Sequence, residues 1–314
     1  MNLKKYISLL IYLITISLIV IFIFVRKDEF HHLFEISTIY LIILLLITSL
    51  SLLFIAYIFK ISISLFNIKF GFKYWFGLSI INSMYNYILP ARGGMAIRAV
   101  YLKKKHNFPY AQYLSFTVGS YLLGFFTSSL IALLVSLILY LNYEINFLFI
   151  HLSLFLFILT SLAIFIAIKI KPQNISENNK ILKFFKNASE GLHFFKDKPR
   201  IIIEIILLRL ILIIILSLRL YLSYYILNIN IAFEKIILIE ALVAFSIVLS
   251  IAPGNIGIQE GIIGLSASLL GLSFDQALMG AVLDRISSMI IIFIFGLIYS
   301  KVLIGEFKFN QLNR

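Results

Sequence analysis

The chain has 314 residues, of which 61% are hydrophobic, and it contains no cysteine. A soluble domain is about 45–50% apolar, so this composition excludes an ordinary soluble enzyme and predicts a polytopic membrane protein. The lack of cysteine excludes disulfides and thiolate metal sites. The five histidines are scattered without metal-ligand spacing. We therefore expect no metal and no cofactor.

The net charge is +13. In a soluble protein this charge would suggest nucleic-acid binding, but no basic patch interleaved with aromatic residues occurs here. In a membrane protein, Lys and Arg gather in cytoplasmic loops and face anionic headgroups. We therefore expect membrane lipids as partners, no nucleic acid, and a place in the cytoplasmic membrane of a prokaryote.

A membrane-spanning helix needs about 20 apolar residues. The first apolar segment is followed by no small-residue cleavage site, so it predicts a span rather than a signal peptide. The fold class is therefore predicted to be all-α. Six segments qualify as spans: 6–25, 37–59, 111–141, 147–168, 201–226 and 276–303.

Two further apolar segments, 74–100 and 236–271, are interrupted by a proline and by a glycine four residues later. The first contains YILPARGGMAIR and the second contains SIAPGNIGIQE. Lysines flank the first segment on both sides, whereas the flanks of the second carry one lysine. Under the positive-inside rule, the first segment is predicted to enter and leave the membrane from the cytoplasm. The second is predicted to do the same from outside.

Six spans and two re-entrant hairpins place both termini in the cytoplasm. The single domain, 1–314, then divides into two halves of opposite orientation, about 1–146 and 147–314. Inverted repeats with interrupted helices are a recurring plan of transporters, with the site at the breaks. The alternative makes each interrupted segment a full crossing, which gives eight spans and places one of the two basic loops beside 74–100 outside.

The polar stretch 177–198 predicts an amphipathic helix that lies under the cytoplasmic leaflet. Ile181, Phe184 and Phe185 fall on one helical face, together with Leu192 and Phe195. Anchoring is the simpler role of such a helix, and gathering anionic lipid is the alternative.

Every lysine lies in a loop or at a helix end, but five of the eight arginines lie within apolar segments. An arginine at mid-bilayer costs ~2.5–3.5 kcal/mol on insertion scales, so each must face a cavity, a partner or a ligand. Its rigid fork of donors suits phosphate or carboxylate. The five are Arg92, Arg98, Arg209, Arg219 and Arg285.

The acids at depth are Glu240, Glu260 and Asp284. The expected ion pairs join Arg285 with Glu240 or Glu260, and Arg209 with Glu204. Four residues are candidates for ion coupling or for structural ion pairs: Glu240, Asp284, Arg209 and Arg219.

A broken helix frees backbone groups that need a protein partner or a wet cavity, and helix N-termini attract anions. The first break is therefore predicted to bind an anion such as a phosphate. The second places a carboxylate beside it, which could receive a cation, an amine or a proton. Asn86 either lines a polar cavity or satisfies the freed backbone. With Pro90 and Pro253 as helix breakers, the predicted lipid- or anion-binding residues are Asn86, Arg92, Gly93, Gly94, Arg98, Asn255, Gly257, Glu260 and Arg285.

These residues resemble a known family. LPARGGMAIRAVYLKKKHN resembles Pro-x-Arg-x-Gly-Glu-x-x-Arg followed by a basic loop, and APGNIGIQE resembles Pro-Gly-Gly-x-Gly-x-x-Glu. Both patterns belong to the transmembrane, flippase-like family of lysylphosphatidylglycerol synthetase, and the resemblance covers nearly the whole chain. It implies a domain that moves lipids between leaflets. Three positions depart from the pattern: Met95 replaces a Glu, Asn255 a Gly and Gln259 a frequent basic residue.

The family's bifunctional members carry a cytosolic aminoacyl-transfer domain after this region. This chain ends at Arg314, so we expect no lysyltransferase activity and leave room for a separate lipid-modifying enzyme. The departures at 95 and 259 weaken the expectation that the substrate is the family's aminoacylated lipid.

The leading hypothesis is therefore a lipid flippase or scramblase in which a headgroup crosses between the two breaks. The sequence has no G-x-x-x-x-G-K-[ST] motif, so we expect no ATPase and either downhill or ion-coupled transport. The alternative is an ion-coupled transporter of a soluble anion, which needs a site closed to lipid. A membrane enzyme is disfavoured because no paired carboxylates lie in an aqueous loop.

Overall fold

The computed structural model describes residues 38–143, 146–169, 186, 189–190, 198–250 and 252–312. These residues contain helices and no strand, and five helices are long and apolar enough to cross a membrane. The predicted all-α polytopic membrane protein is thereby confirmed. The five are α3 (Thr38–Ser64), α6 (Tyr110–Tyr143), α7 (Leu148–Lys169), α9 (Pro199–Ile226) and α12 (Phe274–Leu312).

These five helices coincide with five of the six predicted spans. The remaining predicted span, 6–25, lies outside the described residues, as does most of the predicted amphipathic helix 177–198.

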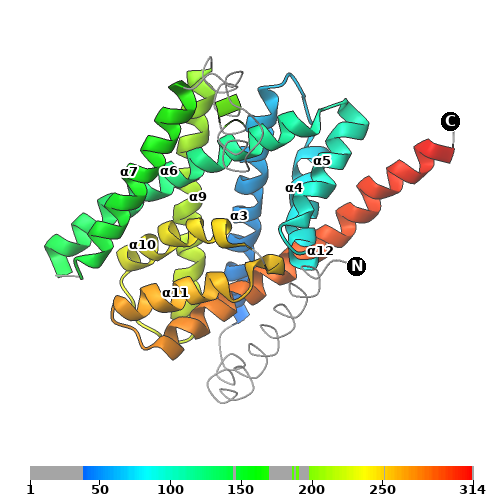
Figure 1. Ribbon diagram of the computed structural model, residues 1–314. Helices are drawn as coiled ribbons and strands as arrows, with labels where there is room; N and C mark the ends of the chain where they lie inside the picture. Colours follow the sequence, from blue (N-terminus) through cyan, green and yellow to red (C-terminus); the bar gives the residue numbers. More distant parts are fainter. Residues whose placement is uncertain are drawn as a thin grey trace, which may run out of the picture.

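Both interrupted segments form helical hairpins (Figure 1). The first pairs α4 (Phe72–Ile88) with α5 (Gly93–His106), and the second pairs α10 (Phe233–Val243) with α11 (Ile258–Leu269). Two 3-10 helices, Ala244–Leu249 and Pro253–Asn255, connect α10 to α11. The second break thus begins well before the proline that the sequence marks, because the chain already tightens after Val243.

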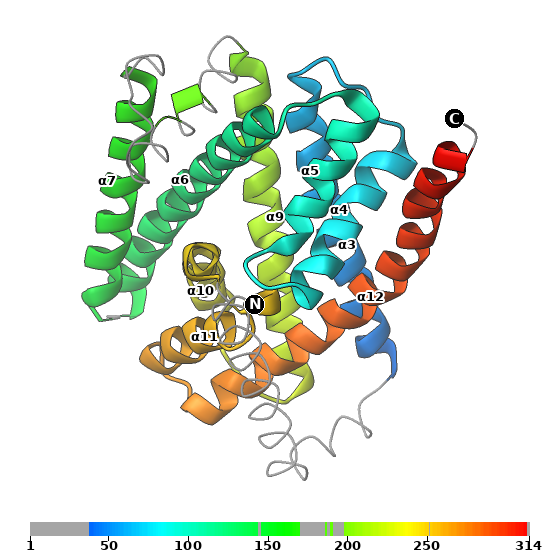
Figure 2. The ribbon, with the colours of Figure 1, turned by 45° about the vertical axis from the view of Figure 1, so that its right-hand side comes forward.

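The tips of the two hairpins lie close together near the middle of the molecule (Figures 1 and 2). One buried core surrounds each hairpin. The first packs α4 and α5 against α3 and the later part of α12. The second packs α10 and α11 against the ends of α6 and α9 and the beginning of α12. Because α12 belongs to both cores, it links the two hairpins.

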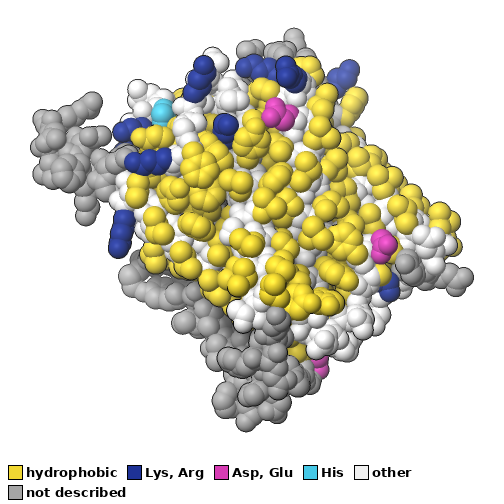
Figure 3. Space-filling view, turned by 180° about the vertical axis from the view of Figure 1, so that it is seen from behind, with side chains coloured by type: hydrophobic (Ala, Val, Ile, Leu, Met, Phe, Trp, Pro, Cys, Tyr) yellow, Lys and Arg dark blue, Asp and Glu magenta, His cyan; other side chains and the backbone are white. Residues whose placement is uncertain are grey.

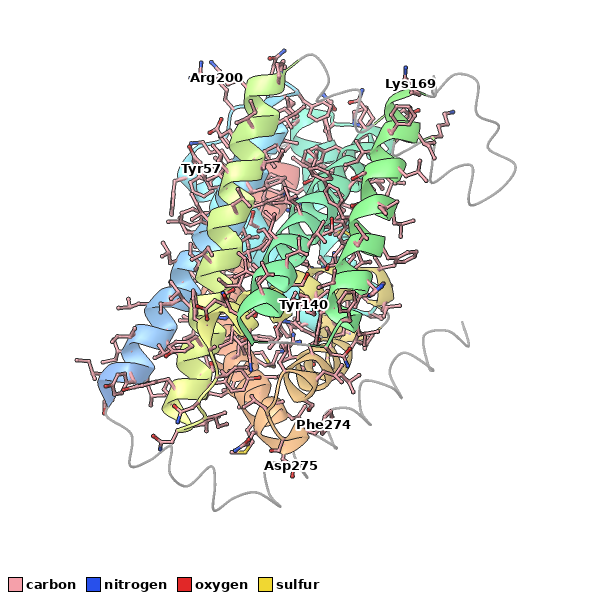
Figure 4. The ribbon with its side chains drawn as sticks, turned by 90° about the vertical axis from the view of Figure 1, so that its left-hand side faces the viewer. Tyr57, Tyr140, Lys169, Arg200, Phe274 and Asp275 are labelled. Carbon is pink, nitrogen blue, oxygen red and sulfur yellow. The ribbon has the colours of Figure 1, made fainter. Side chains whose placement is uncertain are left out.

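A broad apolar surface covers the face of the bundle seen in Figure 3, and most of the Lys and Arg side chains on this face gather toward one end of it. Lys169 and Arg200 lie at this basic end, and Phe274 and Asp275 lie at the opposite end (Figure 4). The outward faces of α7 and α9 carry exposed Leu, Ile and Phe side chains, which in water would form a large aggregation-prone patch. This pattern is what a lipid-facing surface requires.

The order of long helix, hairpin and long helix occurs twice, in α3 to α6 and in α9 to α12. The relation of the halves by an inverted repeat and the re-entrant path of each hairpin stay predictions.

Replacing Gly94 with alanine tests the close contact inside the first hairpin. An added Cβ at this position would lie 2.0 Å from the backbone oxygen of Asn82, which cannot move without distorting α4. We expect Gly94→Ala to destabilise the protein by about 1–3 kcal/mol, as overpacked sites do. Thermal unfolding in detergent measures the change. The control is Gly261→Ala, where a Cβ meets nothing within 4 Å, and an unfolding temperature equal in both variants would contradict the hairpin contact.

Candidate functional site

The first break begins where Pro90 ends α4. A residue before proline disfavours the α conformation, and Leu89 accordingly adopts extended geometry with ψ 140°. Ala91 and Arg92 then take left-handed conformations, with φ values of 49° and 57°. Such conformations are unfavourable for residues with a side chain and concentrate at functional sites. The strained pair turns the chain by way of Gly93 into α5.

Asn86 satisfies part of the backbone that this break frees. Its Oδ1 atom accepts a hydrogen bond of 3.0 Å from the N–H of Gly94, in the first turn of α5. Of the two roles that the sequence left open for Asn86, the structure therefore shows backbone satisfaction.

Arg92 and Arg98 both donate to tyrosine hydroxyls on α6. Arg92 Nη1 lies 2.5 Å from the hydroxyl of Tyr121, and Arg98 Nε lies 2.8 Å from the hydroxyl of Tyr113. The guanidinium of Arg98 also stacks over the ring of Phe59 at 4.3 Å. No described carboxylate pairs with either arginine. Within the described part of the chain, their positive charges are therefore held by aromatic groups and not by a carboxylate.

Arg209 reaches the same part of α6 from α9. Its Nη2 atom donates to the backbone oxygen of Ser120 at 2.7 Å and to the Ser120 hydroxyl at 3.0 Å. Its Nε atom is buried without a hydrogen-bond partner. No ion pair with Glu204 occurs among the described residues, so the predicted Arg209–Glu204 pair is replaced by a contact with the helix beside the first break.

The second break contains three residues with positive φ, whereas the first break contains two. Gly254, Asn255 and Gly257 have φ values of 64°, 57° and 84°. Asn tolerates this region better than most residues, which explains how it can stand where the family pattern has glycine. The Asn255 amide also donates to the Ser246 hydroxyl at 2.8 Å, which holds the two 3-10 helices together.

Glu260 and Arg285 close the second break. Glu260 Oε2 accepts from the backbone N–H of Gly257 at 2.8 Å and so caps α11, while Oε1 lies 2.5 Å from Arg285 Nε. The Arg285–Glu260 ion pair is one of the two alternatives predicted for Arg285. The guanidinium also donates to the Gly254 carbonyl at 2.8 Å and to Gln259 Oε1 at 3.0 Å. The substituted position 259 thus supplies a neutral acceptor.

Tyr87 joins the two breaks. Its hydroxyl accepts from Arg285 Nη1 at 3.0 Å, and its ring packs on Gly254 so closely that a Cβ there would lie 2.4 Å from a ring carbon. The last turn of α4 is therefore in direct contact with the tip of the second hairpin, although the two residues are far apart in sequence.

Arg219 and Asp284 form a second buried pair behind this junction. Arg219 Nε and Nη2 lie 2.5 and 2.7 Å from the two carboxylate oxygens of Asp284. This bidentate geometry is the strong form of an arginine–carboxylate contact. Arg219 and Asp284, which the sequence analysis named as candidates for ion coupling or for structural ion pairs, thus form an ion pair with each other.

The five arginines at depth thus fall into two groups. Arg219 and Arg285 are neutralised by Asp284 and Glu260. Arg92, Arg98 and Arg209 pair with no described carboxylate and surround one stretch of α6, from Tyr113 to Tyr121. The sequence identified all five arginines and placed Tyr87 near the first break. It did not identify the partner of Tyr87, or Tyr113 and Tyr121, because a tyrosine in an apolar helix does not show which residue it contacts.

Comparison with known proteins identifies the class. Residues 7–296 match the family described as the lysylphosphatidylglycerol synthase TM region. The chain belongs to this family, and the predicted resemblance is confirmed over nearly its whole length. No curated protein matches the chain.

The buried Arg219–Asp284 pair generates a stability prediction. Removing one partner of a buried pair leaves an uncompensated charge and costs about 3–5 kcal/mol, whereas replacing both partners with apolar residues is far less damaging. We expect Arg219→Leu to destabilise the protein strongly and the double variant Arg219→Leu, Asp284→Leu to recover most of the loss. Unfolding in mixed micelles of a denaturing detergent measures this. A single variant that loses under about 1 kcal/mol, as an exposed pair would, contradicts the burial.

Proposed function

We propose that the protein moves a phospholipid or a related anionic lipid between the leaflets of a membrane, as a flippase or scramblase. The observation that carries this proposal is the group of arginines beside a helix break that pair with no described carboxylate, namely Arg92, Arg98 and Arg209. Arginine is suited to phosphate because its fork of donors matches the oxygens of the group. The proposal includes neither ATPase nor lysyltransferase activity.

The arginines follow a path along α6. Tyr113 and Tyr121, which hold Arg98 and Arg92, are eight residues apart, about 12 Å along a helix. Beyond Tyr121, Phe125 stacks on it and on Phe245 of the second break, with ring centroids 6.3 and 5.1 Å apart. A headgroup that passes from Arg98 to Arg92 would thus be led to the second break.

Exposed aliphatic side chains at both breaks favour a lipid over a soluble anion. Ile88 is 48% exposed and Val248 is 69% exposed, and each lies within a few residues of the polar groups of its break. Acyl tails can therefore stay against apolar surface while the headgroup meets the arginines. A carrier of a soluble anion needs the opposite arrangement, with its polar site shielded from lipid.

The Tyr87–Arg285–Gly254 contact is proposed as the closed state of the path. A phosphate can accept the same Arg285 donors that now bind Tyr87 and the Gly254 carbonyl. Exchange of these acceptors would separate the two tips and would let the headgroup through. Glu260 would keep Arg285 in place during the exchange, because it binds a different atom of the guanidinium.

The basic end of the bundle supports the predicted orientation. We propose that this end faces the cytoplasm, with both termini on that side, in the cytoplasmic membrane of a prokaryote. The first hairpin would then enter from the cytoplasm and the second from outside. A separate enzyme would supply any modified lipid.

Lipid translocation in liposomes that contain the purified protein tests the proposal. We expect headgroup-labelled phosphatidylglycerol to exchange leaflets, and Arg98→Gln to slow the exchange ten- to a hundredfold, since a hydrogen bond to a charged group contributes about 1.5–3 kcal/mol. The matched control is Arg200→Gln, which removes the same charge at an exposed helix end.

Uptake of inorganic phosphate and of glycerol phosphate, measured in the same liposomes, separates the two classes of substrate. Uptake of either solute without exchange of any labelled lipid would overturn the proposal in favour of a soluble-anion transporter. Equal exchange rates in Arg98→Gln and the wild type would remove Arg98 from the path.

A further inference from the structure

Among the residues that the structure describes, Glu240 is a buried carboxylate that forms no ion pair. Two ion pairs, Arg219–Asp284 and Arg285–Glu260, join four of the charged side chains that are buried among the described residues. The fifth, Glu240 in α10, is 5% exposed, and its Oε1 atom has no hydrogen-bond partner. An ionised carboxylate here would have lost its water without gaining a partner, which is strongly unfavourable.

Charged side chains and one tyrosine lie near Glu240 on the helices around it. α9 brings Arg219 and Tyr224, and α12 brings Asp284 and Arg285. The charged residue of α11 is Glu260, whose two oxygens already bind Arg285 and the Gly257 N–H. α6 and the 3-10 helix after α10 contain no Asp, Glu, Lys, Arg or His.

None of the hydrogen bonds made by the donors around Glu240 goes to Glu240 itself. The Tyr224 hydroxyl donates to the Ala277 carbonyl at 2.9 Å, and Arg219 directs Nε and Nη2 to Asp284. A bound metal cation would need several free oxygens, but both carboxylate oxygens of Asp284 accept from Arg219. The described residues also hold no cluster of three or more potential metal ligands. The species that best completes this carboxylate is therefore a proton.

We propose that Glu240 is a proton-binding site and that its protonation is coupled to lipid movement; the coupling rests on the function proposed above, whereas the proton site does not. The proton adds to the Oε1 atom from water on one side of the membrane and leaves from the same atom to water on the other. No bond other than O–H forms or breaks, and no electron is transferred.

The coupling follows from the competition for Arg219. When Glu240 is protonated, Arg219 belongs to Asp284 alone, and α9 is fixed to α12. When Glu240 is ionised, two carboxylates attract the same guanidinium, and the Arg219–Asp284 contact weakens. Asp284 directly precedes Arg285, which holds the two hairpin tips together. Loss of the proton is thereby transmitted along α12 to the junction through which the headgroup would pass.

The first experiment uses liposomes with a trapped pH-sensitive dye and an imposed pH gradient. Glu240→Gln mimics the protonated carboxyl with the same shape, and the matched control is Glu234→Gln, an exposed acid in the first turn of the same helix. We expect wild type and Glu234→Gln to carry protons with labelled phosphatidylglycerol and to respond to the gradient. Glu240→Gln should lose both effects. The coupling would be overturned if the pH gradient changed the lipid exchange rate of Glu240→Gln as much as that of the wild type. It would also be overturned if a sodium gradient, and not the pH gradient, set the exchange rate.

The second experiment does not depend on lipid transport. Infrared difference spectra of the purified protein, recorded across a pH titration, report protonated carboxyl groups through their C=O stretch. We expect a band at neutral pH that is absent in Glu240→Gln and present in Glu234→Gln. Lack of the band in the wild type would overturn the proton site itself. If the band is present but the same protein exchanges no lipid in liposomes, the proton site is supported and the proposed lipid transport is contradicted.

Discussion

The lipid bilayer offers no water to a broken helix, and this constraint governs the rest of the structure. Backbone groups freed at mid-membrane must be satisfied by protein or must line a wet cavity. Here side chains satisfy part of the freed backbone, and one of them joins the two breaks. Arg285 donates to the carbonyl of Gly254 in one break and to Tyr87 at the end of the helix that enters the other. Asn86 and Glu260 then cap the half-helices that leave the breaks.

Charge at depth is distributed according to the same constraint. Where an arginine stabilises the fold, as Arg219 and Arg285 do, a carboxylate lies within hydrogen-bond distance. Where an arginine is held by tyrosine hydroxyls or by the backbone, no described carboxylate pairs with it, and we propose that its charge serves a ligand. These charges lie together along α6, whereas the paired ones lie at and behind the junction. In the proposed path, a phosphate-bearing headgroup would meet the first group before it meets the second.

Much of this arrangement could be predicted from the sequence, because the bilayer leaves few alternatives. Length and apolar content were sufficient for α3, α6, α7, α9 and α12, and proline followed by glycine marked both hairpins. The partner of Arg285 was limited to two acids, one of which was right. The pairing of Arg209 with Glu204 was wrong, since sequence spacing cannot show that α9 faces Ser120 of α6. The role of Tyr87 could not be foreseen either, because it depends on a contact between residues 198 positions apart.

A disulfide between the two breaks tests the central claim most directly. A Cβ at Gly254 lies 3.2 Å from Tyr87 Cγ, which is one bond from the Tyr87 Cβ. The two Cβ atoms are therefore near the separation of about 3.5–4.5 Å found in disulfides, and the φ of 64° at Gly254 adds strain to the cysteine there. The chain contains no other cysteine, and the reduced form of the Tyr87→Cys, Gly254→Cys variant serves as its own control. The account predicts that oxidation in the membrane links the two positions and stops lipid exchange, and that reduction restores it. A linked protein that exchanges lipid as fast as the reduced one, or a pair that does not link, would contradict it.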